Sequence, residues 1–558
     1  MKTLMAFILP LLAGTLAAAP SELQREIDAG IRSGKKEIVL SRPEYRLDRT
    51  LQLKKLNGVT VNGNGARIVM TRPVHAVRIT GCRGLTLKGL SVDYDPLPFT
   101  QGVVTSVSKD FQVVEFTIDK GYPDLTAPYA VGRLHLFAAD GRTWKREAAD
   151  LYGKTEILDT RRGRFRSFKP EPAFAPGDRV ALNLRRNGAF YLTGCGPVRF
   201  ENITVYACPS LGFCNRFSEG GDEFVNVKIM RGPRPAGAET DRLLSSCADG
   251  VNYAYIRRGP TLINCDFSFM GDDSVNLHSV ALPVVKVLNG TTFDTLRPYK
   301  QEEFGKVIRP GDKLRLLDPS DYSVAGEAVI RSFRPSPRSY DRETLSRFYF
   351  DRGHGLHEWT AYEVVLEPGG TPLKPGLFFD IPAIGANGYV IRDSYFHDHR
   401  GRSLRIMASN GVIENNRFER IKHAAITVGA EYGYWREAGW VENIQIRNNR
   451  IRDVGCNMML QPDSYANGAI SVFARLEDYS GSFKGNRNIT ISGNRIDTCP
   501  AAGIFVFAAD GVRLQGNRLV NTAFGKKIPG SNLGFRDMKP VWIVNSANVS
   551  RQSENMKE

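Results

Sequence analysis

The sequence predicts an all-β protein, a right-handed parallel β-helix that carries two small inserted antiparallel β-barrels. Three observations support this prediction. Short strands recur about every 20 to 25 residues, Asn or Gly stands at the turns between them, and two long stretches interrupt the repeat. Each coil of such a helix needs sharp corners, and Asn and Gly tolerate the left-handed backbone conformation found there.

The repeat is clearest in two matching segments. "AVRITGCRGLTLKGLSVDYD" from Ala76 and "AFYLTGCGPVRFENITVYAC" from Ala189 share one frame of alternating short strands around Thr-Gly-Cys. Later copies begin at 388, 411, 441 and 487, with Asn-Asn, Asn-Gly or Gly-Asn at their turns. Stacked side chains at these turns are expected to form structural ladders: Asn415, Asn416, Asn448, Asn449, Asn494 and Asn517.

The two interruptions divide the chain. We expect a signal peptide at 1–19, coils at 20–96, a barrel at 97–186, coils at 187–281, a second barrel at 282–381, coils at 382–545 and a polar tail at 546–558. Both barrel segments contain Pro-Gly-Asp followed by a basic residue, in "APGDRVALNLR" from 175 and "RPGDKLRLLDP" from 309. This shared hairpin indicates that the two barrels are related to each other.

The first residues and the charge limit the compartment and the partners. Lys2, an apolar run from Leu4 to Leu16 and small residues up to Ala19 are typical of a secretory signal peptide, which predicts a secreted or periplasmic protein without a membrane span. The net charge of +16 comes from singly scattered basic residues, so nucleic acid is not expected as a partner. The 8 cysteines lack metal-ligand spacing and are expected to be small buried thiols, and no metal or cofactor is predicted.

One segment repeats itself within a single coil length. In "CADGVNYAYIRRGPTLINCDFSFMGDDSVNLHS", from Cys247, Asp273 and Asn276 lie 24 residues after Asp249 and Asn252. If one coil takes that length, the backbones at Asp249 and Asp273 lie about 4.8 Å apart, the spacing of neighbouring strands. Asp272 leaves the same turn in another direction, so three carboxylates are predicted at one corner.

The next coils add basic side chains to this face. In the same register, "RGRSLRIMAS" and the coil after it bring cations level with the aspartates and with Asn276: Arg402, Arg405 and His423. The insertion "AEYGYWREAGW" at 430–440 is expected to bring Tyr432, Tyr434 and Trp435 to the rim, where an aromatic face can pack on the apolar side of a sugar. The alternatives are ion pairing with the aspartates for the arginines and core packing for the aromatic residues.

Three interpretations of the acidic cluster compete. A corner ladder of Asp side chains bonding to backbone explains one Asp per coil but not the doubled Asp272-Asp273. A calcium site would suit a lyase-like enzyme. A glycosidase would use one carboxylic acid to protonate the departing oxygen and the other carboxylates to activate water, with inversion where the water has room. The doubled Asp facing a row of Arg and His favours the glycosidase, and a non-enzymatic β-helix that binds glycans is the rival outside catalysis.

The motifs also resemble a known group of enzymes. "ADG" followed about one coil later by "GDDSV" resembles the polygalacturonase clan of β-helix glycosidases, although Gly-His-Gly is missing and "LRIMA" stands where Arg-Ile-Lys would bind a uronate. With "VDYDPLPFTQG" from 92, "CADGVNY" from 247 and "GDDSVNLHS" from 271, the whole layout is similar to the α-galactosidases of glycoside hydrolase family 110. Those are exo-acting enzymes that remove terminal α-1,3-linked galactose, as from blood group B antigen.

The resemblance implies metal-free inverting hydrolysis of a glycan with terminal α-galactose, and a homodimer. Carried onto this sequence, it makes Asp272 the general acid, with a raised pKa, while Asp249 and Asp273 hold and deprotonate the water. Sugar-binding roles fall to a second set: Asn276, Arg402, Arg405, His423 and Trp435. The alternatives are a polygalacturonase- or lyase-like enzyme acting on another polysaccharide, and a non-enzymatic glycan-binding β-helix.

Overall fold

The structure of the protein is a computed structural model that describes most of the chain after residue 20. The described residues are 21–299, 303–350, 356–456, 468–477, 479, 481–525, 538–552 and 555–557. The predicted signal peptide at 1–19 lies outside them, as does part of the predicted tail at 546–558. No described helix is long and apolar enough to span a membrane.

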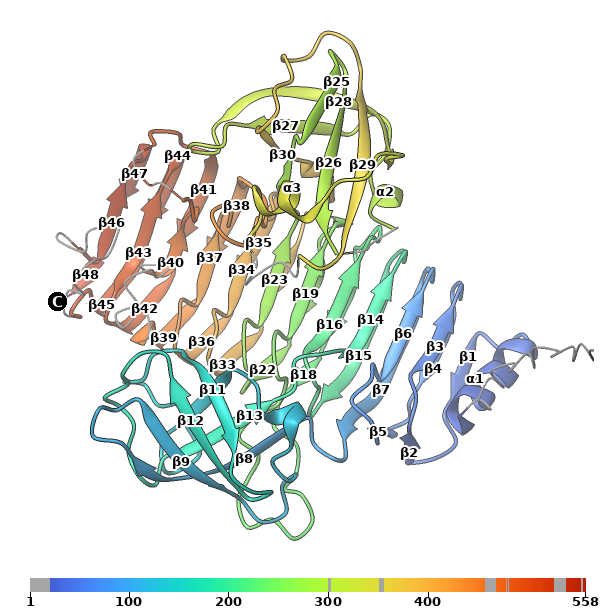
Figure 1. The fold of residues 1–558 in the computed structure, drawn as a ribbon, viewed down its shortest axis with the longest axis vertical. Coiled ribbons are helices and arrows are strands. Elements are labelled where there is room, and N and C mark those ends of the chain that lie inside the picture. Colours follow the sequence, from blue (N-terminus) through green and yellow to red (C-terminus); the bar gives the residue numbers. More distant parts are fainter. Residues whose placement is uncertain are drawn as a thin grey trace, which may run out of the picture.

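Short parallel strands stack into a β-helix, with the N-terminal strands at one end and the C-terminal strands at the other (Figure 1). One face of it is an 11-stranded parallel sheet. Its strands are β3 (Leu51–Lys54), β6 (Val77–Thr80), β14 (Gly188–Thr193), β16 (Leu211–Arg216), β19 (Val251–Ala254), β23 (Val275–His278), β34 (Leu404–Ile406), β37 (Ile426–Val428), β40 (Gly468–Val472), β43 (Ala502–Phe507) and β46 (Val541–Val544). The predicted all-β fold with a parallel β-helix is confirmed.

The other two faces form one 22-stranded sheet, because β7 (Leu85–Tyr94) and β15 (Val198–Val205) run through the corner between them. The second face continues with β1 (Glu37–Val39), β4 (Thr60–Asn62), β17 (Glu223–Val225), β21 (Thr261–Ile263), β32 (Val390–Arg392), β35 (Gly411–Glu414), β38 (Glu442–Arg447), β41 (Asn486–Ser492), β44 (Ala509–Gln515) and β47 (Ala547–Gln552). The third face continues with β2 (Glu44–Leu47), β5 (Arg67–Met70), β18 (Lys228–Ile229), β22 (Asp266–Ser268), β33 (Tyr395–His399), β36 (Arg417–Ile421), β39 (Arg450–Val454), β42 (Arg495–Cys499), β45 (Arg518–Thr522) and β48 (Asn555–Lys557). A short pair, β20 (Ile256–Arg258) and β31 (Gly385–Asn387), lies beside them.

A helix that the repeat pattern does not predict covers the N-terminal end of the stack. Helix α1 (Glu22–Arg32) is capped by Ser21, whose side chain accepts a hydrogen bond from the backbone N–H of Gln24. Its apolar stripe, with Leu23 and Ile27 fully buried, packs on the continuous core inside the coils. The helix therefore shields a core end that would otherwise face water.

The asparagine turns form the predicted ladder. One asparagine from each of four successive coils takes part: Asn416, Asn449, Asn494 and Asn517. The backbone and side-chain N–H groups of each donate to the side-chain carbonyl of the next, at 2.9 to 3.1 Å. The residues before the first two, Asn415 and Asn448, have φ of 57° and 56°, in the left-handed region. The ladder therefore satisfies its polar groups within the coils. Buried thiols, as predicted for the cysteines, are found at Cys82, Cys195, Cys208, Cys214, Cys247, Cys265 and Cys499, and Cys456 is half-buried.

The first insert is a closed six-stranded antiparallel barrel, called barrel 1 below. Its strands are β8 (Phe99–Val107), β9 (Val113–Ile118), β10 (Arg133–Phe137), β11 (Leu151–Ile157), β12 (Arg162–Ser167) and β13 (Arg179–Asn183), with the 3-10 turn η1 (Ala127–Tyr129) between β9 and β10. The coil before it and the coil after it pair directly, Val77 with Phe190, which is the predicted offset of 113 residues.

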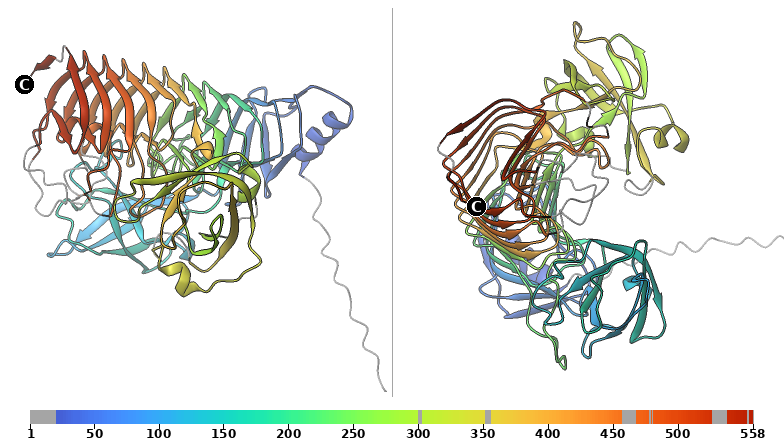
Figure 2. Two further views of the ribbon diagram at one scale, coloured as in Figure 1. Left: turned by 90° about the horizontal axis from the view of Figure 1, so that it is seen from above. Right: turned by 90° about the vertical axis from the view of Figure 1, so that its left-hand side faces the viewer.

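The second insert, called barrel 2, is a seven-stranded antiparallel sheet. Its strands are β24 (Leu282–Pro283), β25 (Lys286–Asn289), β26 (Thr292–Pro298), β27 (Lys313–Leu317), β28 (Val324–Pro335), β29 (Trp359–Leu366) and β30 (Phe378–Asp380); the short helices α2 (Phe304–Val307) and α3 (Arg342–Ser346) and the turn η2 (Pro382–Ile384) accompany it. The two edge strands are halves of one bent segment, 282–289, which pairs with β30 at one end and with β26 at the other. The sheet thus returns on itself. Both barrels project from the same side of the β-helix (Figure 2).

Candidate active site

Strand register brings the predicted site residues together. Pairing of β19, β23 and β34 aligns equivalent positions on successive coils: Asn252, Asn276 and Arg405. The turn positions preceding them in the same register are Asp249, Asp273 and Arg402. The next pairing, of β34 with β37, places His423 level with Gly401 and hence with Asp272. The predicted 24-residue repeat is therefore the register of the coils.

These turns border a pocket of about 270 Å³. The side chains to which the sequence analysis gave a catalytic or sugar-binding role all line it: Asp249, Asp272, Asp273, Asn276, Arg402, Arg405, His423 and Trp435. Barrel 1 supplies a further wall: Arg133, Asp150, Tyr152 and Arg185. The remaining lining includes Arg400, Gly401 and Glu437. No residue of barrel 2 lines this pocket, within the described part of the chain.

Asp249 is the aspartate of the cluster whose pKa is raised. It lies in the turn before β19 and is 6% exposed, and Asn252 donates a hydrogen bond of 2.7 Å to its Oδ2. Burial first, and then the negative charges of Asp272 and Asp273, raise its pKa to about 7. Near pH 7 this carboxyl is therefore partly protonated, whereas an ordinary aspartate would be ionised.

Asp272 has the opposite environment. Its Oδ1 accepts a hydrogen bond of 2.6 Å from Arg400, and its Oδ2 lies 3.0 Å from Arg185 and 3.4 Å from Arg133. Burial alone would raise the pKa of Asp272, but these guanidinium charges outweigh it and hold the pKa well below its usual range. The expectation of a raised pKa at Asp272 is therefore wrong for the substrate-free protein, because the sequence analysis placed neither Arg400 nor the arginines of barrel 1 beside it.

Asp273 is fixed by a two-pronged ion pair. Arg402 donates from Nε to Oδ1 and from Nη2 to Oδ2, both at 3.0 Å, and its backbone N–H donates to Oδ1 at 2.8 Å. The preceding Gly401 permits this close approach: a Cβ there would lie 2.5 Å from the carbonyl carbon of Asp272 and 2.7 Å from Oδ1 of Asp273. Ion pairing, the alternative considered for Arg402, is thus what the structure contains.

The other predicted sugar-binding side chains differ in how they are held. Arg405 lies 2.7 Å from Glu437, a residue of the 430–440 insertion that the sequence analysis did not select. His423 Nε2 lies 3.8 Å from Asp150 of barrel 1. Asn276 lines the pocket, and its Oδ1 is buried and accepts no hydrogen bond from the described residues.

The aromatic insertion divides between rim and core. Trp435 is 39% exposed and lines the pocket, as predicted. Tyr432 is fully buried, stacks on Tyr322 at a centroid distance of 4.7 Å and donates a 2.8 Å hydrogen bond to Asp380. Its predicted place at the rim is therefore wrong: the packing of barrel 2 against the coils draws it into the core. Tyr434 is half-buried and stacks on Phe350.

The residues that the sequence analysis missed come mainly from outside the repeat. Arg133 and Arg185 reach the site from barrel 1, and Arg400 comes from the turn after β33. Only Arg400 left a signal, because it lies two residues before Arg402 in the basic phrase "HRGRSLR". Among the described residues, no three His, Cys, Asp or Glu side chains are grouped to hold a metal ion.

The chain was compared with known proteins. No family model matches it. It is 23% identical over 511 residues to α-1,3-galactosidase B of Bacteroides thetaiotaomicron, covering 84% of this chain and 74% of the relative. It is 22% identical over 538 residues to α-1,3-galactosidase B of Phocaeicola vulgatus, covering 90% and 83%. With α-1,3-galactosidase A of Bacteroides fragilis the identity is 20% over 547 residues, covering 90% and 84%.

Among solved structures, the A-module of the mannuronan C-5 epimerase AlgE4 of Azotobacter vinelandii matches with a TM-score of 0.33 and 10% identity over 94% of each chain. The surface adhesin PfbA of Streptococcus pneumoniae matches with a TM-score of 0.34 and 8% identity, over 90% of this chain and 86% of that one. The resemblance expected from the motifs is confirmed by sequence: over most of its length, this chain is similar to the α-1,3-galactosidases.

Proposed function

We propose that this protein is a glycoside hydrolase that removes terminal α-1,3-linked galactose from glycans such as blood group B antigen. The observation that carries the proposal is the charge pattern of the pocket. One buried carboxyl has a pKa raised to about 7, and beside it two carboxylates are paired with arginines. Acid and base in one site are what glycoside hydrolysis requires. The galactoside substrate is supported by the names of the relatives.

The reaction needs one proton donor and one proton acceptor. A carboxylic acid gives its proton to the glycosidic oxygen as the bond from that oxygen to the anomeric carbon breaks. A water, losing a proton to a carboxylate, forms the new bond to the anomeric carbon from the opposite face, so the configuration inverts. Three carboxyl groups on adjacent turns of the pocket provide both functions.

The charges bear on which aspartate is the acid. In the substrate-free protein the raised pKa favours a proton on Asp249, and the lowered pKa of Asp272 favours its ionised form. Asp272 keeps the acid role inferred from the family resemblance only where a bound glycan displaces its arginines and a proton reaches it. Otherwise Asp249 is the acid, and Asp272 with Asp273 activates the water. The two assignments predict different responses to the leaving group, as set out in the Discussion.

Sugar recognition is assigned to the polar and aromatic lining. We assign the galactose hydroxyls to Asn276, Arg402 and Arg405, and the apolar side of the ring to Trp435, because all four side chains line the pocket. His423 completes this set. Export by the signal peptide and homodimerisation stay predictions.

The test is the release and anomeric form of galactose. The protein is incubated with an α-1,3-galactosyl disaccharide and with the fucose-branched B trisaccharide, and the anomeric proton signal is followed by NMR. We expect β-galactose at early times, before mutarotation. Early α-galactose would indicate a covalent glycosyl-enzyme and contradict inversion. No release from any α-galactoside at any pH would favour the glycan-binding alternative.

A lyase-like, calcium-dependent reaction is the other enzymatic alternative. We expect a chelator to leave galactose release unchanged, because Asp272 and Asp273 already pair with arginine side chains, which occupy oxygens that calcium would need. Activity that is lost with chelator and restored by calcium, or an unsaturated sugar product, would overturn the hydrolase assignment.

A further inference from the structure

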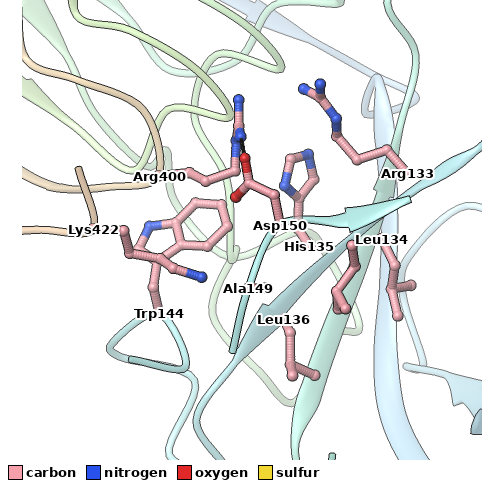
Figure 3. A pocket seen from close by; sticks show the side chains of 10 residues that line it. Arg133, Leu134, His135, Leu136, Trp144, Ala149, Asp150, Arg400 and Lys422 are labelled. Carbon is pink, nitrogen blue, oxygen red and sulfur yellow. Dashed lines mark hydrogen bonds and ion pairs between the residues drawn. The ribbon is translucent and has the colours of Figure 1, made fainter. Parts of the chain in front are cut away.

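One arginine joins barrel 1 to the acidic turn. The side chain of Arg400 is 9% exposed and bonds three acceptors. Figure 3 shows its contact with Asp150. Its Nε donates to the backbone oxygen of Gly271 at 2.7 Å and its Nη2 donates to Oδ1 of Asp272 at 2.6 Å. Its Nη1 donates to Oδ2 of Asp150, which belongs to barrel 1. One guanidinium group is therefore shared between a barrel carboxylate and a carboxylate of the predicted catalytic cluster.

Asp150 is held as an anion at this contact. It lies directly before β11, and its side chain is 10% exposed. Burial would raise its pKa, but the positive charge of Arg400 and the nearby His423 outweigh burial, so the pKa lies well below its usual range. Asp150 is thus ionised wherever the fold is intact.

The position of Asp150 depends on how barrel 1 docks on the coils. Trp144 Nε1 donates a 2.9 Å hydrogen bond to the backbone oxygen of Asp398, and Asn183 Nδ2 donates a 2.6 Å bond to that of Cys247. Lys422 Nζ donates a 2.8 Å bond from the coils to the backbone oxygen of Ala148, two residues before Asp150. These buried bonds fix the barrel segment against the turn that carries the aspartates.

Stability alone does not account for this arrangement. A buried ion pair gains little net stability over apolar packing, because both ions lose their hydration. The Asp150–Arg400 pair is also not isolated, because the same guanidinium group donates a hydrogen bond to Asp272. A change of charge on Asp150 must therefore alter how strongly Arg400 pulls on Asp272.

We propose that Asp150 is a positioning residue which, through Arg400, sets the geometry and charge balance of Asp272, so that barrel 1 is part of the catalytic apparatus. The inference rests on the proposed function, which it deepens. The other basic side chains that line the two pockets around this contact are Arg133, His135, Arg185, Arg402, Arg405, Lys422 and His423. The other acidic side chains that line them are Asp249, Asp273 and Glu437.

The variant Asp150→Asn isolates the charge, because it keeps the shape of the side chain and one acceptor oxygen for Arg400. The full charge of Arg400 then acts on Asp272, and the cluster loses a nearby negative charge. We expect kcat on a galactosyl disaccharide to fall about 10- to 100-fold, with KM within about twofold. The alkaline limb of the pH profile should move to lower pH by about half a unit to one unit.

Two further variants separate this role from a structural one. Asp178→Asn is the matched control: Asp178 is a buried carboxylate of barrel 1, paired with Lys145 at 2.8 Å, that does not line the pocket. It should lower the unfolding midpoint without moving the pH profile. Asp150→Glu restores the charge and should recover the position of the alkaline limb, even where its longer side chain leaves kcat reduced.

A second measurement does not depend on activity. In protein labelled with carbon-13 at aspartate Cγ, the Asp249 carboxyl is assigned by its absence in Asp249→Asn and is titrated by NMR. Asp150→Asn should lower its midpoint, while Asp178→Asn should not. If wild type releases no galactose, the proposed function fails while this titration still tests the coupling. If the titration and the pH profile of Asp150→Asn match those of wild type, the inference is overturned.

Discussion

Two corners of the same β-helix carry stacked polar side chains, and they differ in where those side chains find their partners. In the asparagine corner, each amide is satisfied by the amide of the next coil and by a backbone oxygen of the coil before, as for Asn449 between Asn494 and Ile413. In the acidic corner, Asp249, Asp273 and Arg402 follow one another, and the adjoining Asp272 takes partners from barrel 1. The asparagine corner consists of neutral groups that bond to one another and so stabilise the stacking of the coils. The acidic corner alternates between acidic and basic side chains and takes some of its partners from barrel 1, which makes it the candidate site.

The largest expected effect comes from removing charge at the acidic corner. Asp249→Asn, Asp272→Asn and Asp273→Asn should each lower kcat on a galactosyl disaccharide by about 10²-fold or more. Asp249→Asn should do so with an unchanged or higher unfolding midpoint in urea, because it removes a carboxyl whose ionisation its surroundings oppose.

The leaving group separates the roles of the three aspartates. Protonation helps a sugar alkoxide greatly and an aryl leaving group much less. The charges of the pocket predict that Asp249→Asn keeps the larger fraction of its activity on a nitrophenyl α-galactoside. The same pattern in Asp272→Asn instead would restore the role inferred from the family resemblance. If all three variants were fully active, the proposed catalytic site would be wrong.

The opposite exchange at the asparagine corner should cost stability and leave catalysis intact. Asn449→Asp removes the donor that bonds the backbone oxygen of Ile413 and the side chain of Asn494, and it places a carboxylate in a fully buried column. We expect the free energy of unfolding to fall by about 3 kcal/mol or more. In the fraction that stays folded, kcat and KM should match wild type. A loss of kcat without a loss of stability would show that the two corners are not independent.

The two corners also mark how far the sequence alone reaches. The register of the coils follows from the period of the repeat, so the sequence alone aligns Asp249, Asp273 and Arg402. The arginines of barrel 1 could not be placed, because the docking of an inserted domain depends on tertiary packing that no local pattern encodes. The raised pKa expected for Asp272 was wrong partly for this reason, because Arg185 and Arg133 of barrel 1 add to the effect of Arg400 on that pKa. Tyr432 was misplaced because contacts with barrel 2, which lies far from it in sequence, decide its burial.

A smaller effect is expected from pH. The pKa of Asp249 is raised to about 7, so the native protein keeps a proton that the unfolded chain releases near the ordinary value for Asp. The contribution of Asp249 to stability is therefore present at low pH and is lost as the pH rises through about 7. If Asp249 is the acid, galactose release should decline over the same range. The effect on stability is measured as the difference in the free energy of unfolding in urea between about pH 5 and about pH 8. Asp249→Asn should remove the part of this difference that Asp249 contributes. The control Asn449→Ala, a change in the neutral ladder, should leave the difference unchanged.

The smallest effect on activity is expected from a change in the pocket wall. The acidic corner borders a pocket, and Trp435 contributes to the shape of that pocket without contributing charge. Trp435 is half-exposed at the rim and makes no ion pair with the aspartates, so its replacement leaves the proton chemistry in place. An aromatic face contributes about 1 kcal/mol to packing on an apolar surface, which corresponds to about a fivefold rise in KM. Trp435→Ala should therefore raise KM with kcat unchanged, while Phe524→Ala, which removes a 55% exposed aromatic side chain that does not line the pocket, should leave both constants as they are. A fall in kcat at constant KM would mean that Trp435 acts on the transition state, and the wall would then belong to the catalytic apparatus as much as the acidic corner does.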